Sequence, residues 1–311
     1  MARSKTGVLG ILKESFSDFM QDDCMDSAAA LSYYTIFSLP AILVLMLLLV
    51  SSVMDPTDVR GGLQSQLQSL MGPTAGEQIR TIIQQAEQKP SNGLIPTLLG
   101  IAGLLFGATG AFGQLQKALN RAWNVKPDPH QGGIKNFLTK RLFSFGMILV
   151  VAFLLLVSLV VSATLSGLGD KLESFLPSGL SEPLLQVVNL VISFGVIVLL
   201  FAALFKVLPD AQISWRSVWV GAAVTAALFV LGKFLIGFYL GRTNPGQAYG
   251  AAGSLAVLLL WVYYSALILL LGAEFTETWA MRRGEGIEPE PGAVRVKEEK
   301  QRFREAGSPA R

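Results

Sequence analysis

Few residues of this chain have the types and spacing that catalysis requires. Metal-dependent hydrolysis needs clustered His, Asp or Glu ligands that hold an ion and activate water. The chain has one histidine, His130, in a Pro-Asp-Pro-His-Gln-Gly-Gly turn that lacks metallohydrolase spacing. It also has one cysteine, Cys24, so it can form no intramolecular disulfide. We therefore expect a protein that is not an enzyme, uses no cofactor or metal and binds no nucleic acid.

Charged groups within or beside apolar stretches are better candidates for a functional role. Lys233 is the one charge in residues 217–240, and Glu274 directly follows a charge-free stretch that ends at residue 273. Burying an unpaired charge in the bilayer costs about 2.5–3.5 kcal/mol even on the lenient insertion scale, so such groups are functional candidates. The structural alternatives are a lysine that extends to the interface and a glutamate that is solvated or paired.

Two further polar groups precede and follow the apolar stretches. Asp22 and Asp26 are four residues apart and share a helical face, which fits either a solvated helix cap or an entry site for cations. Asn120 and Arg121 belong to a basic loop. Such a loop either only sets the topology or also contacts anionic lipid headgroups.

Small and aromatic residues inside the apolar stretches allow two interpretations each. Gly103-x-x-x-Gly107 lets another helix approach closely, so it indicates either helix packing or a transport path lined by backbone. Trp261 and Tyr264 lie three residues apart near the middle of a stretch, where membrane aromatic belts are not expected. They either pack against other helices or line an internal cavity.

The elements that carry these residues are strongly apolar. Of 311 residues, 51% are hydrophobic and 15% charged, with a mean hydropathy of +0.50, whereas soluble domains carry about 25% charged residues. A helix needs about 20 residues to cross a bilayer. Continuous apolar runs favour helices over barrel strands. The sequence therefore predicts an all-α polytopic bundle of six transmembrane helices, at about residues 31–54, 94–116, 142–166, 183–205, 217–240 and 249–273.

Positive charge predicts the orientation of the bundle. Nineteen Lys and Arg residues fall in the N-terminal segment, the second and fourth connections and the tail, against five in the remaining connections. The positive-inside rule then places both termini in the cytoplasm of a bacterium, with the bundle in its inner membrane.

The parts outside the spans have their own character. Residues 1–30 are predicted to contain an interfacial amphipathic helix, with Val8, Leu12, Phe16, Phe19 and Met20 on its apolar face. Residues 31–280 form the membrane domain, in which the outer loop at 55–93 carries two short amphipathic segments. The charged, proline-containing tail at 281–311 is predicted to be disordered, so truncation after about Arg283 should leave the fold intact.

Five stretches carry a family resemblance. They are Asp26–Pro40, Gly107–Val125, Leu208–Asp210, Tyr249–Ser254 and Gly272–Thr276. In order and spacing they resemble the YihY/virulence factor BrkB family, once labelled ribonuclease BN, over roughly residues 10–280. The resemblance implies a six-helix inner-membrane protein and assigns no catalytic residue. The single histidine argues against the nuclease label.

These observations leave three functions of different class, of which a membrane enzyme is the weakest because no nucleophile–base pair or metal cluster appears in the sequence. The first is a transporter or flippase-like carrier of lipid, envelope precursor or ion, which would contact membrane lipids. The second is a non-transporting envelope scaffold, and either could form a homo-oligomer. For a carrier, we expect the site between the second, fifth and sixth spans, with Lys233 and Glu274 bracketing the path near its two ends.

Overall fold

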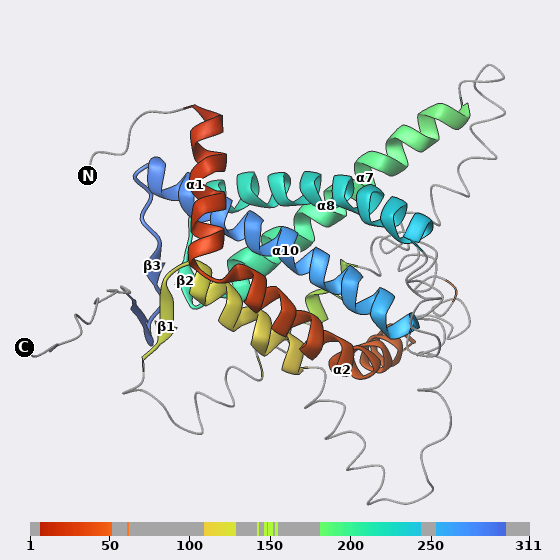
Figure 1. Cartoon of the computed structure of the whole chain (residues 1–311), viewed down its shortest axis with the longest axis horizontal. Coiled ribbons are helices and arrows are strands. Elements are labelled where there is room, and N and C mark those ends of the chain that lie inside the picture. Colours follow the sequence, from red (N-terminus) through yellow and green to blue (C-terminus); the bar gives the residue numbers. More distant parts are fainter. Residues whose placement is uncertain are drawn as a thin grey trace, which may run out of the picture.

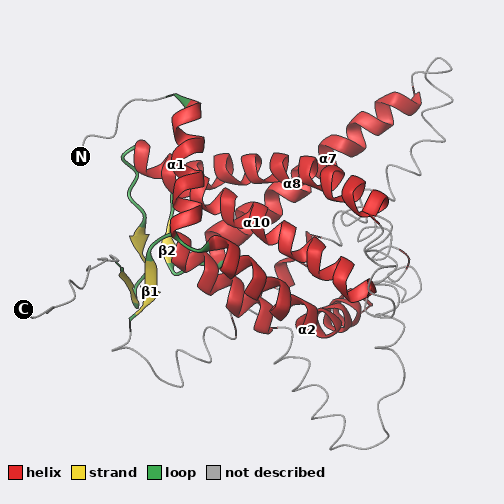
Figure 2. Ribbon diagram, in the orientation of Figure 1, coloured by secondary structure: helices red, strands yellow, loops and turns green. Residues whose placement is uncertain are grey.

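The structure is a computed structural model, and it describes part of the chain. The described residues are 7–51, 61, 109–128, 142, 146–147, 149–151, 153–154, 181–243 and 253–296. The predicted spans at 94–116 and 142–166 lie largely outside these residues, as do Gly103, Gly107 and nearly all of the outer loop. Helices make up most of the described chain (Figure 2).

Four described helices are long and apolar enough to cross a membrane. They lie at Cys24–Val44, Leu190–Val207, Trp215–Tyr239 and Leu255–Arg282. Each overlaps one predicted span, namely those at 31–54, 183–205, 217–240 and 249–273. The full helices are α2 (Cys24–Ser51), α7 (Ser181–Val207), α8 (Trp215–Thr243) and α10 (Gly253–Arg282). A further helical segment covers residues 109–122.

Two helix ends differ from the prediction. Helix α2 begins at Cys24 rather than near residue 31, and α10 continues to Arg282 rather than ending near residue 273. Hydropathy locates the stretch that meets hydrocarbon, whereas tertiary packing decides how far a helix extends. Glu274 consequently lies inside a long helix and not at its end.

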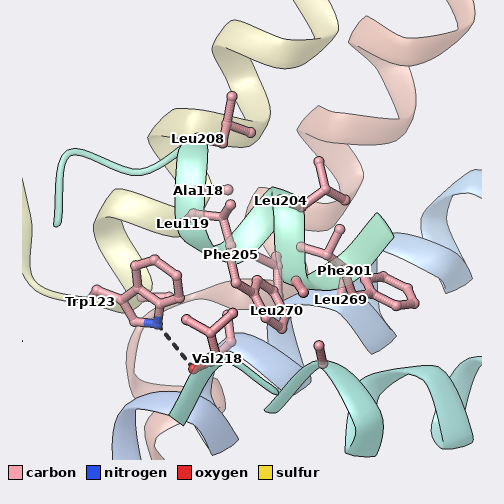
Figure 3. Packing of buried hydrophobic residues seen from close by; sticks show 14 of the residues in the cluster. Ala118, Leu119, Trp123, Phe201, Leu204, Phe205, Leu208, Val218, Leu269 and Leu270 are labelled. Carbon is pink, nitrogen blue, oxygen red and sulfur yellow. Dashed lines mark hydrogen bonds between the residues drawn. The ribbon is translucent and has the colours of Figure 1, made fainter. Parts of the chain in front are cut away.

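Helix α10 is the central element of the bundle. It packs against α8, α2 and α1, while α7 packs against α8 (Figure 1). A hydrophobic core at one end of the bundle joins these helices, with Trp123, Phe205, Val218 and Leu270 at its centre (Figure 3).

Helices α8 and α10 cross closely because each has a glycine against which a threonine side chain of the other helix packs. A Cβ on Gly221 would overlap the side chain of Thr276, and a Cβ on Gly272 would overlap that of Thr225. Each threonine hydroxyl donates to a backbone carbonyl four residues earlier, at 2.7 Å, so its polar group is satisfied within its own helix. Small residues that allow such an approach are typical of membrane helix interfaces.

Helix α1 (Val8–Gln21) lies where the N-terminal amphipathic helix is predicted, but its apolar residues divide between two faces. Ile11 and Phe19 are buried, on the side that packs on α10. The exposed apolar side chains are Leu9, Leu12, Phe16 and Met20. Phe19 therefore belongs to the core and not to the exposed face with which it was predicted. The side chain of Val8 lies outside the described residues.

Four short strands lie at the α1 end of the bundle (Figure 1). Strand β1 (Val125–Pro127) pairs antiparallel with β4 (Ala293–Arg295), with Val125 opposite Arg295. Strand β2 (Ala211–Gln212) pairs antiparallel with β3 (Glu288–Pro289), with Ala211 opposite Pro289.

These strands correct the prediction of a tail that is disordered from residue 281. Arg283 to Val296 is ordered, because backbone groups of the tail bond to loops of the membrane domain. The Glu290 N–H donates to the Asp210 carbonyl at 3.0 Å, and the Val296 N–H to the Asn124 carbonyl at 2.8 Å. Ile287 is buried in the core. The composition of the tail conceals this order, because backbone pairing requires few apolar side chains.

Candidate functional site

Several segments that are distant in sequence meet at one end of the bundle (Figure 1). The end of helix 109–122, the α7–α8 loop, the turn between α1 and α2 and the last turns of α10 all lie there (Figure 1). Three polar arrangements at this end, and one apolar groove beside it, are the candidates for function.

The first arrangement is centred on Asp210 in the α7–α8 loop. Asn120 donates from Nδ2 to Asp210 Oδ2 at 2.8 Å and accepts from the Asp210 N–H at its Oδ1, also at 2.8 Å. Gln116 Nε2 donates to Asp210 Oδ1 at 3.1 Å. The carboxylate thus joins helix 109–122 to the loop, and its carbonyl holds the tail through Glu290. Asn120, proposed from sequence as a loop residue, is a buried structural contact.

The second arrangement joins helix 109–122 to α10. The indole of Trp123 is fully buried and donates from Nε1 to the Ala273 carbonyl at 3.0 Å (Figure 3). Its ring lies edge-on to Phe205, with 6.0 Å between centroids. The peptide immediately before Glu274 is therefore fixed by a buried donor.

The third arrangement is a group of buried polar side chains on one face of α10. Glu274 is 0% exposed, Glu277 is 8% exposed and Thr278 is 2% exposed. Residues three and four apart on a helix are neighbours on its surface. Glu274 is thus buried rather than solvated, which removes one alternative left open by the sequence.

Glu274 has a single hydrogen-bond partner in the part of the chain that the structure describes. Cys24 Sγ, at the start of α2, donates to Glu274 Oε1 at 3.4 Å. Glu274 Oε2 and the Thr278 hydroxyl have no partner among the described residues. Glu277 is hydrogen-bonded by the side chain of Asn124. A buried oxygen without a partner is costly, so it indicates a function or a missing ligand.

Acidic groups surround this face of α10. Asp18 of α1 and Asp22 of the α1–α2 turn interact electrostatically with both Glu274 and Glu277. The predicted candidate Asp22 thus approaches the predicted candidate Glu274. Asp26 is exposed in the first turn of α2, where a negative charge favours the helix N-terminus.

Arg121 faces the surface of the same region. Its Nη2 lies 2.5 Å from Asp23 Oδ2, and the two side chains are 41% and 55% exposed. An exposed pair of this kind contributes about 0–1 kcal/mol. Arg121 therefore tethers the α1–α2 turn without neutralising Glu274.

Trp261 and Tyr264 lie elsewhere on the α8–α10 interface, and Lys233 lies on α8. Trp261 packs edge-on against Phe229 with 6.0 Å between centroids, and Tyr264 lies against Gly232. Both are packing contacts between helices. Tyr264 is ten residues before Glu274, about 15 Å along the helix. Lys233 is half-buried, with its amine 5.7 Å from the Phe234 ring centroid. The structure therefore does not bring these three residues together with Glu274.

An apolar groove lies between α7, α8 and the described residues of 149–154. Its volume is about 560 Å³, and its lining consists of Leu149, Val150, Phe153, Leu154, Leu199, Ala202, Ala203, Val207, Trp215 and Trp219. Most of its larger side chains are partly exposed, so the groove is open to the surroundings of the bundle. Lys206 lies beside it, with its amine 5.6 Å from the Trp215 ring centroid and donating to the Ile213 carbonyl at 2.6 Å.

Two glutamates of the tail contact the α7–α8 region, Glu285 at the start of α8 and Glu290 near Asp210. Glu285 accepts hydrogen bonds from Ser214, and from Ser217 at 2.7 Å, and these bonds lower the pKa of its carboxyl. Glu290 has a raised pKa, because of partial burial first and the nearby Asp210 second. A carboxylate at the beginning of a helix is stabilised by the helix dipole.

Sequence reasoning missed Asp210, Cys24, Glu277, Thr278 and the groove. Asp210 and Glu277 carried a weak signal, since each is a carboxylate close to the end of an apolar stretch. Cys24 and Thr278 carried none, because only the packing of α2 on α10 makes them polar neighbours of Glu274. The groove could not be predicted because it forms only where three segments that are distant in sequence come together.

Comparisons with known proteins place this architecture among membrane proteins. The profile of the family described as virulence factor BrkB matches residues 15–297. YfkH of Bacillus subtilis, a protein named for likeness to ribonucleases, is 26% identical over 271 residues, 86% of this chain and 94% of its own length. No solved structure matches the chain.

Longer relatives carry the name UPF0761 membrane protein. One from Acinetobacter baylyi is 28% identical over 258 residues, 82% of this chain and 58% of the relative. One from Pseudomonas aeruginosa is 29% identical over 260 residues, 82% of this chain and 59% of the relative. The chain thus spans somewhat more than half the length of these relatives.

Proposed function

The chain belongs to the virulence factor BrkB family of membrane proteins, and we propose that it is a multi-pass, non-enzymatic carrier of lipid-like amphiphiles in the bacterial inner membrane. We further propose that both described ends face the cytoplasm. The excess of Lys and Arg in the corresponding connections supports this orientation. So does the position of α1 and of the tail strands at one end of the bundle (Figure 1).

The apolar groove beside α7 and α8 carries the proposal. Its volume of about 560 Å³ falls within the range of about 300–1,000 Å³ that is typical of ligand pockets. Every lining side chain is apolar or aromatic, so the complementary part of a ligand is a hydrocarbon chain. Trp215 and Trp219 are exposed at the start of α8, and tryptophan favours the level of lipid headgroups.

The charge beside the groove fits the other part of such a ligand. Lys206 lies at the end of the groove that Trp215 marks, next to the turn between α7 and α8, and Arg216 follows Trp215 in the first turn of α8. Cationic groups at the membrane surface attract anionic lipids. An anionic phospholipid of the cytoplasmic leaflet would place its phosphate near these cations and an acyl chain in the groove.

Lipid movement in liposomes tests this function. The purified chain should accelerate exchange of a fluorescent anionic phospholipid between leaflets, measured by loss of fluorescence when a reductant is added outside. Ala203→Trp fills the groove and should abolish the acceleration. The matched control Ala227→Trp places the same side chain at an exposed position of α8 that does not line the groove, and it should behave as wild type.

Two results would contradict the carrier. One is a wild-type protein that moves no lipid, and the other is an Ala203→Trp variant that moves lipid normally.

An envelope scaffold is the second candidate, and the exposed apolar face of α1 favours it. This face presents Leu9, Leu12, Phe16 and Met20. A scaffold predicts that Leu12→Ser with Phe16→Ser impairs envelope integrity in cells while Ala203→Trp does not. If the protein is a carrier, Ala203→Trp should impair envelope integrity more strongly than the double substitution in α1.

A further inference from the structure

We infer that the polar face of α10 formed by Glu274, Glu277 and Thr278 is a binding site for one monovalent cation, centred on Glu274. No ligand is assigned to this face by the family or by the relatives. The role of the cation in coupling rests on the proposed carrier function, whereas its binding does not.

The first step of the argument is the burial of an incompletely satisfied carboxylate. Glu274 is fully buried, and its Oε2 has no partner among the described residues. Its Oε1 receives only the weak Cys24 thiol donor, at 3.4 Å. An ionised carboxylate in such surroundings is unfavourable unless a positive charge accompanies it.

The second step is that side chains do not supply that charge. No lysine or arginine of the described residues contacts Glu274. Arg121 pairs with Asp23 at the surface, and Arg282 pairs with Glu14 of α1 at 2.6 Å. Arg295 of β4 acts on Glu277 rather than on Glu274.

The third step is that the groups facing Glu274 add negative charge. Asp18 approaches from α1 and Asp22 from the α1–α2 turn, and Glu277 lies one turn along α10. The neutral Cys24 faces it from α2, and Asn124 reaches Glu277 from the segment after helix 109–122. The charged groups among them therefore oppose the binding of an anion at Glu274.

The fourth step is an independent, unpartnered hydroxyl on the same face. Thr225 and Thr276 each donate to a carbonyl four residues earlier, as threonine in a helix commonly does. Thr278 is 2% exposed and has no partner in the described part of the chain. Its Cβ lies about 5–6 Å from that of Glu274. A bound cation between Glu274 Oε2 and Thr278 Oγ1 would satisfy both oxygens.

The ligand set favours a monovalent ion over a divalent one. Within the described ranges, no three His, Cys, Asp or Glu side chains converge in a way that could hold a metal ion. Ca²⁺ takes six to eight oxygen ligands, usually including several carboxylates. One central carboxylate with a hydroxyl suits a single positive charge, which either Na⁺ or a proton on Glu274 can provide.

Thermal unfolding of the full purified chain in detergent tests the inference. The melting temperature is followed by intrinsic fluorescence in three series: NaCl replacing choline chloride at constant ionic strength, KCl doing the same, and decreasing pH in choline chloride. Saturable stabilisation by roughly 5 °C that depends on Glu274 is expected in one series, and that series identifies the ion. Acid stabilisation that persists in Glu274→Gln comes from other groups, such as Glu290.

Three variants distinguish binding from general salt effects. Glu274→Gln should abolish the stabilisation, and Thr278→Val, which keeps the shape, should shift its midpoint about tenfold towards higher cation concentration. Glu288→Gln, in the exposed position of β3, should respond as wild type. If Glu274→Gln fails to fold, Thr278→Val still carries the test.

The inference is overturned if no series stabilises the wild type, or if Glu274→Gln and Thr278→Val respond as strongly as wild type. Failure of the lipid assay with intact cation stabilisation would remove the carrier function and leave this site in place.

Discussion

Asn120 binds Asp210 through both atoms of its side-chain amide, donating to the carboxylate and accepting from the backbone N–H, each at 2.8 Å. The two residues are ninety positions apart in the sequence. This contact fixes the register between helix 109–122 and the α7–α8 loop, and the loop in turn receives the tail. One amide therefore positions three segments around the polar face of α10.

Replacement of Asn120 by aspartate should destabilise the protein. The variant loses the Nδ2 donor and places a carboxylate against Asp210, so we expect a loss of about 2–3 kcal/mol, as for a hydrogen bond to a charged group. Chemical unfolding in mixed detergent measures it. The neighbouring Arg121→Ala removes only an exposed ion pair and should cost less than 1 kcal/mol. Equal losses for the two variants would argue against the Asp210 contact.

Alanine at Gly221 should disrupt the α8–α10 crossing. Its Cβ would overlap Thr276, and overpacking of this kind costs about 1–3 kcal/mol. Gly237→Ala in the same helix meets no atom within 4 Å and should be neutral or stabilising by up to about 1 kcal/mol. Combining Gly221→Ala with Thr276→Ala should recover part of the loss. A tolerated Gly221→Ala would show that the helices do not cross here.

Glu285 should make stability depend on pH in the acid range. Its folded-state pKa is lowered from the ordinary value of 4.5, chiefly by hydrogen bonds from Ser214 and Ser217. The stabilisation is therefore present above the unfolded-state pKa and is lost as the pH falls through the lowered folded-state value. Wild type should melt above Glu285→Gln at neutral pH, and the two melting curves should converge in acid.

Substitution of Glu290 should change stability at neutral pH in the opposite direction from substitution of Glu285. Its pKa is raised, so its ionised form weakens the fold and Glu290→Gln should stabilise the chain at neutral pH. A parallel response of the two glutamine variants would contradict the arrangement of the tail.

Two truncations should show that the part of the tail up to Val296 contributes to stability. Removal of everything after Val296 leaves both strand pairs intact and should not change the melting temperature. Removal after Arg283 deletes β3, β4 and the buried Ile287, whose burial alone contributes about 1.5–3 kcal/mol. Identical melting of the two truncations would support the disordered tail that composition predicts.

Cysteine accessibility should establish the orientation. In a Cys24→Ser background, a cysteine at exposed Glu288 should react with an impermeant maleimide only in inside-out vesicles. A cysteine at Arg242, exposed at the far end of α8, should react only in right-side-out vesicles. The reverse pattern would overturn the cytoplasmic assignment.

Hydropathy could predict the four described spans because each is a continuous apolar run of sufficient length. It could also single out Glu274 and Asp22, because charges beside such runs are rare. It could not predict the Glu274–Cys24 contact, since a thiol near a helix start has the same local pattern whether it faces lipid or a carboxylate. It set Trp261 and Tyr264 along a path bracketed by Lys233 and Glu274, and it could not predict that both aromatic rings pack against α8. The strands of the tail could not be predicted, because backbone pairing leaves little trace in amino-acid composition.

The strand pairs of the tail have a consequence for biogenesis. A chain leaves the ribosome from its N-terminus, so β1 and β2 emerge long before β3 and β4. Neither of the two early strands can acquire its partner until α10 has been synthesised. The strand pairs at this end of the bundle can therefore form only after α10 has been made.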